Sequence, residues 1–175
     1  ICPMTVRNFN ILRYGRGLKI RGVNMNKRVT QVVILAGGLG TRLKPFTNTA
    51  PKPMYPINNI PFIDYLIRQM KNFGMEEVLL LLGYLPEKIM DYLGDGSRYG
   101  LTINYDITPV DYDTGMRIKH AAPQIADKFL LLYCDNYCPI NYSKLFADFC
   151  NNKAKIQITA YSNRDNYTKK QSTYY

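Results

Sequence analysis

The chain has 175 residues, 46% of them hydrophobic, which is enough for one compact domain with a buried core. Its unbroken apolar runs, such as Val78 to Leu82, are far too short to span a bilayer, and no basic-then-apolar leader with a small-residue cleavage site opens it, so neither membrane insertion nor secretion is expected. The formal charge of +10 could suggest a nucleic-acid-binding protein. Residues 1–28, however, hold seven Lys or Arg and no acid, whereas the rest of the chain holds 16 basic and 13 acidic residues. Most of the positive charge therefore belongs to residues 1–28, which argues against nucleic-acid binding by the rest of the chain.

The basic leader, residues 1–28, has no clear helix or strand period, and Met25 stands just before the first strand-like run. We interpret it as a tag, a linker or the end of another domain, in preference to a basic arm for RNA or membrane. Residues 29–175 then form the domain. The cysteines have neither C-x-x-C spacing nor the density of a disulfide scaffold, which indicates reduced thiols in a cytoplasmic protein. They are Cys2, Cys134, Cys138 and Cys150.

From residue 30 onwards, strand and helix patterns alternate along the chain. Apolar or β-branched runs predict strands, and apolar residues at helical spacing predict helices, one of which starts near Pro61 and ends at Gly74. Strands buried on both faces and separated by helices predict a three-layer α/β sandwich with a mostly parallel sheet. The expected strands are 30–35, 76–82, 101–106, 128–133 and 153–161, and the expected helices are 61–73, 86–93, 114–122 and 141–150.

The turn after the first strand, Gly37-Gly-Leu-Gly40, lies where ligands bind in such sheets, at the carboxyl end of a strand. A dinucleotide site would need a third glycine and a following helix, but Leu43 and prolines stand there. A P-loop would need Gly-Lys-Ser/Thr, which is absent. If the glycines are considered by themselves, a glycine-rich turn that binds no ligand is enough to explain them. Arg42 and Lys52 favour a polyphosphate site, with Lys52 held in an extended segment between two prolines.

The segment "LAGGLGTRLKPFTNTAPKPMYPI" (35–57) resembles the signature of the sugar-1-phosphate nucleotidylyltransferases, G-G-x-G-T-R-L-x-P-(x)-P-K-P. The resemblance covers about residues 30–164 and is nearest to the mannose- and heptose-1-phosphate guanylyltransferase-like enzymes. It implies a Rossmann-like sandwich of the nucleotide-diphospho-sugar transferase type. It also implies transfer of a nucleoside monophosphate from an NTP to a sugar 1-phosphate, with release of pyrophosphate, in nucleotide-sugar and cell-surface polysaccharide biosynthesis.

The resemblance assigns roles to individual residues of this chain. Arg42 and Lys52 are the expected catalytic residues, and Asp135, after the fourth strand, is the expected Mg²⁺ ligand, although a lone Asp there can also be a strand-end cap. His120 is expected to be a surface residue and not a base. The expected nucleotide-binding residues are Leu35, Ala36, Gly37, Gly38, Gly40, Thr41, Thr114 and Gly115.

Departures from the family pattern accompany the matches. Thr108, Asp111 and Met116 stand where the family has Glu, Pro and a second Gly, which leaves the base open, and Cys134 replaces the usual Gly before Asp135. The chain ends before the family's sugar-binding half, so we expect little turnover from it alone. An inactive nucleotide-binding or regulatory domain is the alternative. The implied partners are NTP and sugar 1-phosphate, without nucleic acid or membrane; a homo-oligomer and a fused or partner phosphatase domain are compatible with the resemblance.

Overall fold

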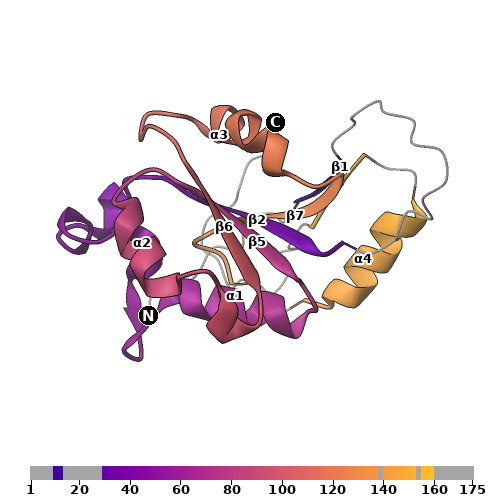
Figure 1. Ribbon diagram of the computed structural model, residues 1–175, viewed down its shortest axis with the longest axis horizontal. Coiled ribbons are helices and arrows are strands. Elements are labelled where there is room, and N and C mark those ends of the chain that lie inside the picture. The colour runs from indigo at the N-terminus through magenta and orange to yellow at the C-terminus, as the bar shows by residue number, and fades with distance from the viewer. Residues whose placement is uncertain (1–9, 14–28, 138–139, 153–154, 160–175) are drawn as a thin grey trace, which may run out of the picture.

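Figure 1 shows the computed structural model, which describes residues 10–13, 29–137, 140–152 and 155–159. A six-stranded sheet in the order β6-β5-β2-β7-β1-β8 forms the middle layer. Its strands are β1 (Asn10–Arg13), β2 (Gln31–Ala36), β5 (Glu77–Leu82), β6 (Thr102–Ile107), β7 (Lys128–Tyr133) and β8 (Ile156–Ile158). The helices are α1 (Phe62–Asn72), α2 (Pro86–Leu93), α3 (Thr114–Ala121) and α4 (Tyr142–Asn151), and β3 (Pro56–Ile57) with β4 (Ile60–Pro61) forms a separate hairpin.

Four neighbouring strands, β6, β5, β2 and β7, are parallel and in direct register. Val33 of β2 lies between Leu79 of β5 and Leu131 of β7, so the carboxyl ends of these strands meet at one edge. Every residue of β2 is buried, as expected of a strand covered on both faces. The α/β sandwich with a mostly parallel sheet that the sequence predicts is therefore confirmed.

Two apolar layers lie on opposite faces of the sheet. The larger one packs α1, α2 and α4 against alternate strand residues such as Val32 and Leu80. The smaller one packs α3, through Ala121, against Val33 and Leu79. Figure 1 shows α3 on one side of the sheet and the other three helices across from it. Because successive strand residues point to opposite faces, β2, β5 and β7 contribute to both layers.

Helix α1 carries a charged group in its buried face. Asp64 is only 2% exposed and accepts hydrogen bonds from Arg68 (2.5 Å), Tyr92 (3.2 Å) and Tyr99 (2.7 Å). Burial alone would raise the pKa of Asp64, but these hydrogen bonds and the charge of Arg68 outweigh it and lower that pKa. Asp64 thereby ties α1 to α2 and to the turn that follows it. The helix ends at Asn72, and Gly74, the glycine predicted to cap it, follows with φ +76°.

The basic leader contributes a strand that its sequence did not predict. β1 pairs antiparallel with both β7 and β8, with Asn10 opposite Leu131 on one side and Ile158 on the other. Within the predicted fifth strand, 153–161, the structure has β8; residues 153–154 and 160–175 lie outside the described residues, as do Cys2 and Cys138. Among the described residues, no helix has both the length and the hydropathy needed to cross a membrane.

Candidate functional site

The candidate site is a cavity of about 460 Å³ at the carboxyl ends of the parallel strands. Residues from the turn after β2, from the loop between β6 and α3, and from the segment after β7 line it. Several of them are predicted site residues, and the remainder were not singled out from the sequence. The lining consists of Leu35, Gly38, Gly40, Thr41, Arg42, Leu43, Lys52, Pro53, Val110, Tyr112, Asp113, Thr114, Arg117, Tyr133, Cys134 and Asp135.

The turn after β2 depends on glycine at its end. Gly40 has φ +62°, a conformation that L side chains rarely adopt, and a Cβ there would lie 2.9 Å from Cβ of Lys52. Thr47 holds the turn from beneath, because its hydroxyl donates to the Gly40 carbonyl (3.2 Å). Tyr84 in turn donates from its hydroxyl to the Thr47 carbonyl (2.8 Å). The turn is therefore fixed by its own backbone and by two buried or half-buried side chains.

Gly38 differs from its neighbours because it faces open space. A Cβ at Gly38 would meet nothing within 4 Å, so its main chain is accessible from the cavity. Gly37 is buried and does not line the cavity. Ala36 also does not, because its side chain belongs to the large apolar layer. The structure thus brings Leu35, Gly38 and Gly40 to the cavity but not Ala36 or Gly37.

Lys52 and Asp135 meet across the cavity as an ion pair. Nζ of Lys52 lies 2.6 Å from Oδ2 of Asp135, and both side chains are about one-third exposed (34% and 33%). Lys52 does not lie in an extended segment as expected: it begins the 3₁₀ helix η3 (Lys52–Met54). The amides of Met54 and Tyr55 donate to the Pro51 and Lys52 carbonyls, and these turn hydrogen bonds outweigh the extended preference of a residue before proline.

Thr41 and Arg42 lie in the 3₁₀ helix η1 (Thr41–Leu43), directly after the glycine turn. Both are exposed and both line the cavity. The cavity therefore has two cationic side chains, Arg42 and Lys52, on the segment that follows β2. Such a pair beside the exposed main chain of Gly38 suits a polyanionic ligand.

The opposite wall is the loop that leads into α3. Asp113 is the N-cap of α3, and its carboxylate accepts from the Met116 amide (2.8 Å). Thr114, predicted from the sequence, lines the cavity beside Val110 and Tyr112. Gly115 is exposed in the first turn of α3 and does not line it.

Arg117 is the main site residue that sequence reasoning missed. It is 4% exposed and lines the cavity floor, and burial lowers the pKa of its guanidinium, although Asp111 and Asp106 offset part of that effect. A basic residue on a short helix is usually solvent-exposed, so the residue type gave no signal. The position of Arg117 along the helix could have indicated its burial, because Arg117 lies one helical turn before the buried Ala121.

Asp135 is the protein carboxylate that the sequence assigns to a metal. Among the described residues no group of three or more His, Cys, Asp or Glu could hold an ion. Asp135 therefore fits a hard cation only if phosphate or water oxygens complete the coordination shell. The neighbouring Cys134 does not compete for that role, because burial and the charge of Asp135 raise the pKa of its thiol to about 12.

His120 lies on α3 and its side chain is 53% exposed, in agreement with the expected surface position. Its Nδ1 is 3.0 Å from Oδ2 of Asp106. His120 does not line the cavity.

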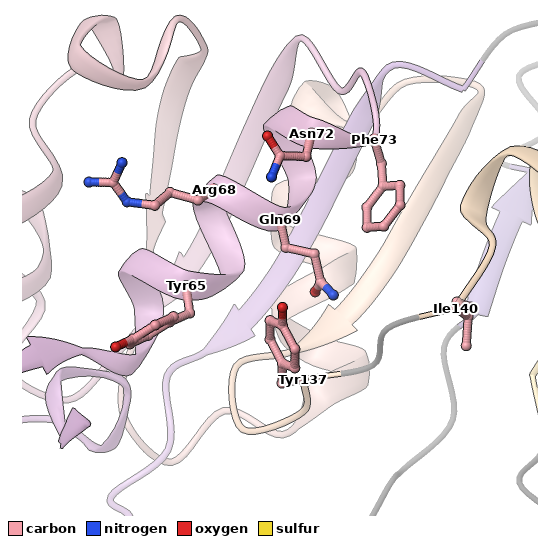
Figure 2. A pocket seen from close by; sticks show the side chains of 7 residues that line it. All are labelled: Tyr65, Arg68, Gln69, Asn72, Phe73, Tyr137 and Ile140. Carbon is pink, nitrogen blue, oxygen red and sulfur yellow. The ribbon is translucent and has the colours of Figure 1, made fainter. Parts of the chain in front are cut away.

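A second cavity, of about 300 Å³, lies beside α1 and the segment after β7 (Figure 2). Its lining shares no residue with the glycine-turn cavity and consists of Tyr65, Arg68, Gln69, Asn72, Phe73, Tyr137 and Ile140. Arg68, the charged member of this set, is already paired with Asp64. We therefore assign the site to the larger cavity.

The sequence model of the nucleotidyl transferase family matches residues 31–170, which includes the glycine turn, both cations and Asp135. The chain belongs to the nucleotidyl transferase family. D-glycero-alpha-D-manno-heptose 1-phosphate guanylyltransferase of Campylobacter jejuni is 38% identical over 66% of this chain and 52% of its own length. Choline-phosphate cytidylyltransferase of Streptococcus pneumoniae is 33% identical over 61% of this chain and 45% of its own.

Solved structures of similar proteins agree with this membership. The crystal structure of HddC from Yersinia pseudotuberculosis complexed with GMP-PN aligns with a TM-score of 0.61 and 35% identity. That alignment covers 69% of this nucleotidyl transferase chain and 54% of HddC. This chain thus spans about half the length of the relatives it matches.

Proposed function

We infer that the protein transfers a nucleoside monophosphate from an NTP to a sugar 1-phosphate. The observation that carries this proposal is one cavity in which an accessible glycine turn, Arg42, Lys52 and Asp135 come together. Family membership and the guanylyltransferase relative support the reaction type. An oxygen of the sugar 1-phosphate attacks the α-phosphorus of the NTP, the new P–O bond gives the NDP-sugar, and pyrophosphate leaves with the bond electrons.

This reaction needs no nucleophilic side chain, so the protein contributes by positioning its substrates and neutralising charge. Gly38 offers main chain to the phosphates at close range. In this proposal Arg42 contacts the β- and γ-phosphates of the leaving pyrophosphate, and Lys52 contacts the α-phosphate or the sugar phosphate. Preorganised cations of this kind stabilise the charge that develops in the transition state.

Magnesium is part of the proposal, with Asp135 as its protein ligand. When bound, it would supply charge neutralisation on the triphosphate oxygens. Asp135 is held at 2.6 Å by the Lys52 ammonium, so a cation and Lys52 compete for the same carboxylate. Nucleotide phosphates can draw Lys52 away from Asp135, which couples nucleotide and cation binding.

We place the reaction in the cytoplasm, where the thiol of Cys134 fits a reducing environment, and in the supply of nucleotide sugars for cell-surface polysaccharides. GTP with a heptose or mannose 1-phosphate is the first substrate pair to test, because of the guanylyltransferase relative. CTP is the next, because of the cytidylyltransferase relative.

The experiment is a pyrophosphate-release assay on the complete gene product, with five common nucleoside triphosphates against a panel of sugar 1-phosphates. We expect one pair to give release that depends on both substrates. Nucleotide binding without release for any pair would contradict the transferase proposal and leave the inactive nucleotide-binding domain in its place.

A further inference from the structure

Arg117 lies beneath the glycine turn, and its guanidinium is surrounded by oxygens from three neighbouring strand ends. Nη1 donates to the Leu82 carbonyl (2.9 Å), at the end of β5, and to the Thr108 hydroxyl, after β6. Nη2 donates to carbonyls of Gly37 (3.3 Å), Pro109 (3.0 Å) and Val110 (3.0 Å). One side chain therefore links the turn after β2, the end of β5 and the loop that leads into α3.

These contacts decide what Arg117 can do in the cavity. Five acceptors surround its two terminal nitrogens, which leaves those nitrogens no N–H bond free for a phosphate. In the part of the chain that the structure describes, no carboxylate forms an ion pair with it. Arg117 is thus a buried cation whose two terminal nitrogens hold four main-chain carbonyls and the Thr108 hydroxyl rather than a ligand.

The space occupied by the guanidinium explains a glycine of the motif. A Cβ on Gly37 would lie 2.5 Å from Nη1 and 2.8 Å from Nε of Arg117. Gly37 is not among the residues with positive φ, so its backbone conformation does not exclude alanine, and the three atoms nearest to such a Cβ all belong to the guanidinium of Arg117. Gly83 is different, because a Cβ there would meet the Gly37 carbonyl oxygen at 2.6 Å as well as Arg117.

We propose that Arg117 is a positioning residue that holds the glycine turn and the 108–110 loop at the separation that a nucleoside triphosphate requires, and that Gly37 lacks a side chain to admit its guanidinium. The inference rests on the proposed function for the identity of the ligand. The walls that Arg117 connects are the ones that carry Gly38 and Val110 in the cavity. Loss of the Arg117 guanidinium would let these two walls of the cavity move independently, while Arg42 and Lys52 would remain in place.

The steric part is tested by thermal unfolding of the 175-residue chain with Gly37→Ala, Arg117→Ala and the double variant. We expect Gly37→Ala to lower the unfolding midpoint by about 3–10 °C in the wild-type background, the range for overpacking. In the Arg117→Ala background the same change should cost less than about 2 °C. Gly96→Ala is the matched control: a Cβ there would clash with Ile103 and the Leu101 carbonyl and not with Arg117, so its cost should be the same in both backgrounds. Equal costs of Gly37→Ala in both backgrounds would overturn the packing relation.

The positioning part is tested by titrating the same chain with GTP, CTP and UTP in a calorimeter, with Mg²⁺ present. Arg117→Ala should weaken the nucleotide bound best by wild type roughly tenfold or more, a change worth about 1.4 kcal/mol per factor of ten. Arg117→Lys should recover little, because an ammonium cannot span the same carbonyls. Lys119→Ala, which removes a charge from the exposed side of α3, is the control and should change affinity less than twofold.

The outcomes separate the two proposals. Steric coupling with unchanged nucleotide affinity in Arg117→Ala would overturn the positioning role and leave a structural one. Full recovery by Arg117→Lys would also overturn it, because charge and not geometry would then be responsible. If wild type binds no nucleotide while the coupling between Gly37 and Arg117 is present, the proposed function fails, the positioning role fails with it, and the packing relation stands.

Discussion

Individual residues of the glycine turn serve different purposes. Position 40 requires glycine because of its backbone conformation, and position 37 requires glycine because the guanidinium of Arg117 occupies the space of a side chain. Neither reason applies to Gly38, which faces open space. A ligand that approaches the main chain would account for the absence of a side chain at Gly38. The motif thus combines two glycines that the fold requires with one, Gly38, that it does not require.

Gly38→Val separates binding from folding. Because nothing lies within 4 Å of a Cβ at this position, the unfolding midpoint should stay within about 2 °C of wild type. The valine would occupy the space that the phosphates need, and nucleotide affinity should fall roughly 100-fold, or about 2.7 kcal/mol. Calorimetric titration with NTP and a thermal scan measure the two quantities. Unchanged affinity would remove Gly38 from the site.

Arg42→Ala and Lys52→Ala test the two cations in the complete gene product. Each should lower kcat/KM by the equivalent of about 2–4 kcal/mol, the range for loss of one preorganised donor. Arg42 is exposed and the half-buried Lys52 pairs with Asp135, so the Arg42 variant should keep its stability more fully. Steady-state kinetics together with unfolding midpoints distinguish the roles. Normal specific activity combined with lost stability would show that the residue is structural.

At the scale of secondary-structure elements, α1 is anchored through a buried carboxylate. Asp64→Asn should lower the free energy of unfolding at neutral pH by about 1–3 kcal/mol, because a charged acceptor of three hydrogen bonds is replaced by a neutral one. The folded state lowers the pKa of Asp64 below its ordinary 3.8, so its contribution is complete above that pH and is lost as pH falls through the folded pKa.

The pH dependence gives this prediction its specific test. Urea unfolding of wild type and Asp64→Asn between about pH 7 and pH 2 should show a stability difference that is constant above about pH 5 and narrows below it. Glu87→Gln, an exposed carboxylate on α2, is the control and should show no such narrowing. A stability difference between wild type and Asp64→Asn that stays constant down to about pH 2 would contradict the lowered pKa of Asp64 in the folded state.

Strand β1 has a testable consequence for its neighbour. β8 is paired with β1 on one side, so a break in β1 should release it. Ile11→Pro removes a backbone donor in the middle of β1, and amide exchange at Ile156–Ile158 should become as fast as in a peptide while β2 and β5 remain protected. Ile11→Val keeps the donor and should leave exchange unchanged. Retained protection of β8 in the proline variant would show that other contacts hold it.

The sequence predicts the parallel strands of this fold but not the antiparallel strand β1. β2, β5 and β7 appear as unbroken apolar runs because both faces are buried, and the pattern alone identifies them. β1 has no such run, and its partner β7 lies more than a hundred residues further along the chain. The same reason explains Arg117: its partners come from three separate strand ends, and no local pattern reveals them.

At the scale of the whole molecule, nucleotide and Mg²⁺ should stabilise the chain together. With saturating NTP at about 100 times its Kd, we expect about 2.7 kcal/mol of added stability. Mg²⁺ alone should have little effect, because Asp135 offers one carboxylate that Lys52 already holds. Thermal scans with NTP, Mg²⁺ or both measure this.

Asp135→Asn is the matched variant for the cation. It should keep the stabilisation by nucleotide and lose the additional effect of Mg²⁺. Full magnesium dependence in Asp135→Asn would identify Asp135 as a strand-end cap. Ordinary turnover by the 175-residue chain alone would contradict the expectation that residues essential for the reaction are missing from it.

The position of β1 between β7 and β8 also bears on how the protein is made. β1 leaves the ribosome long before either partner strand, since Asn10 pairs with Leu131 and Ile158. During synthesis β1 stays unpaired until β7 emerges, and its other edge then stays open until β8 follows; an open edge can pair with strands of other chains. At typical rates of about 5–20 residues per second, the segment from β1 to β8 takes on the order of ten seconds to synthesise. The pairing of β8 thus depends on an early segment that remains available until β8 emerges.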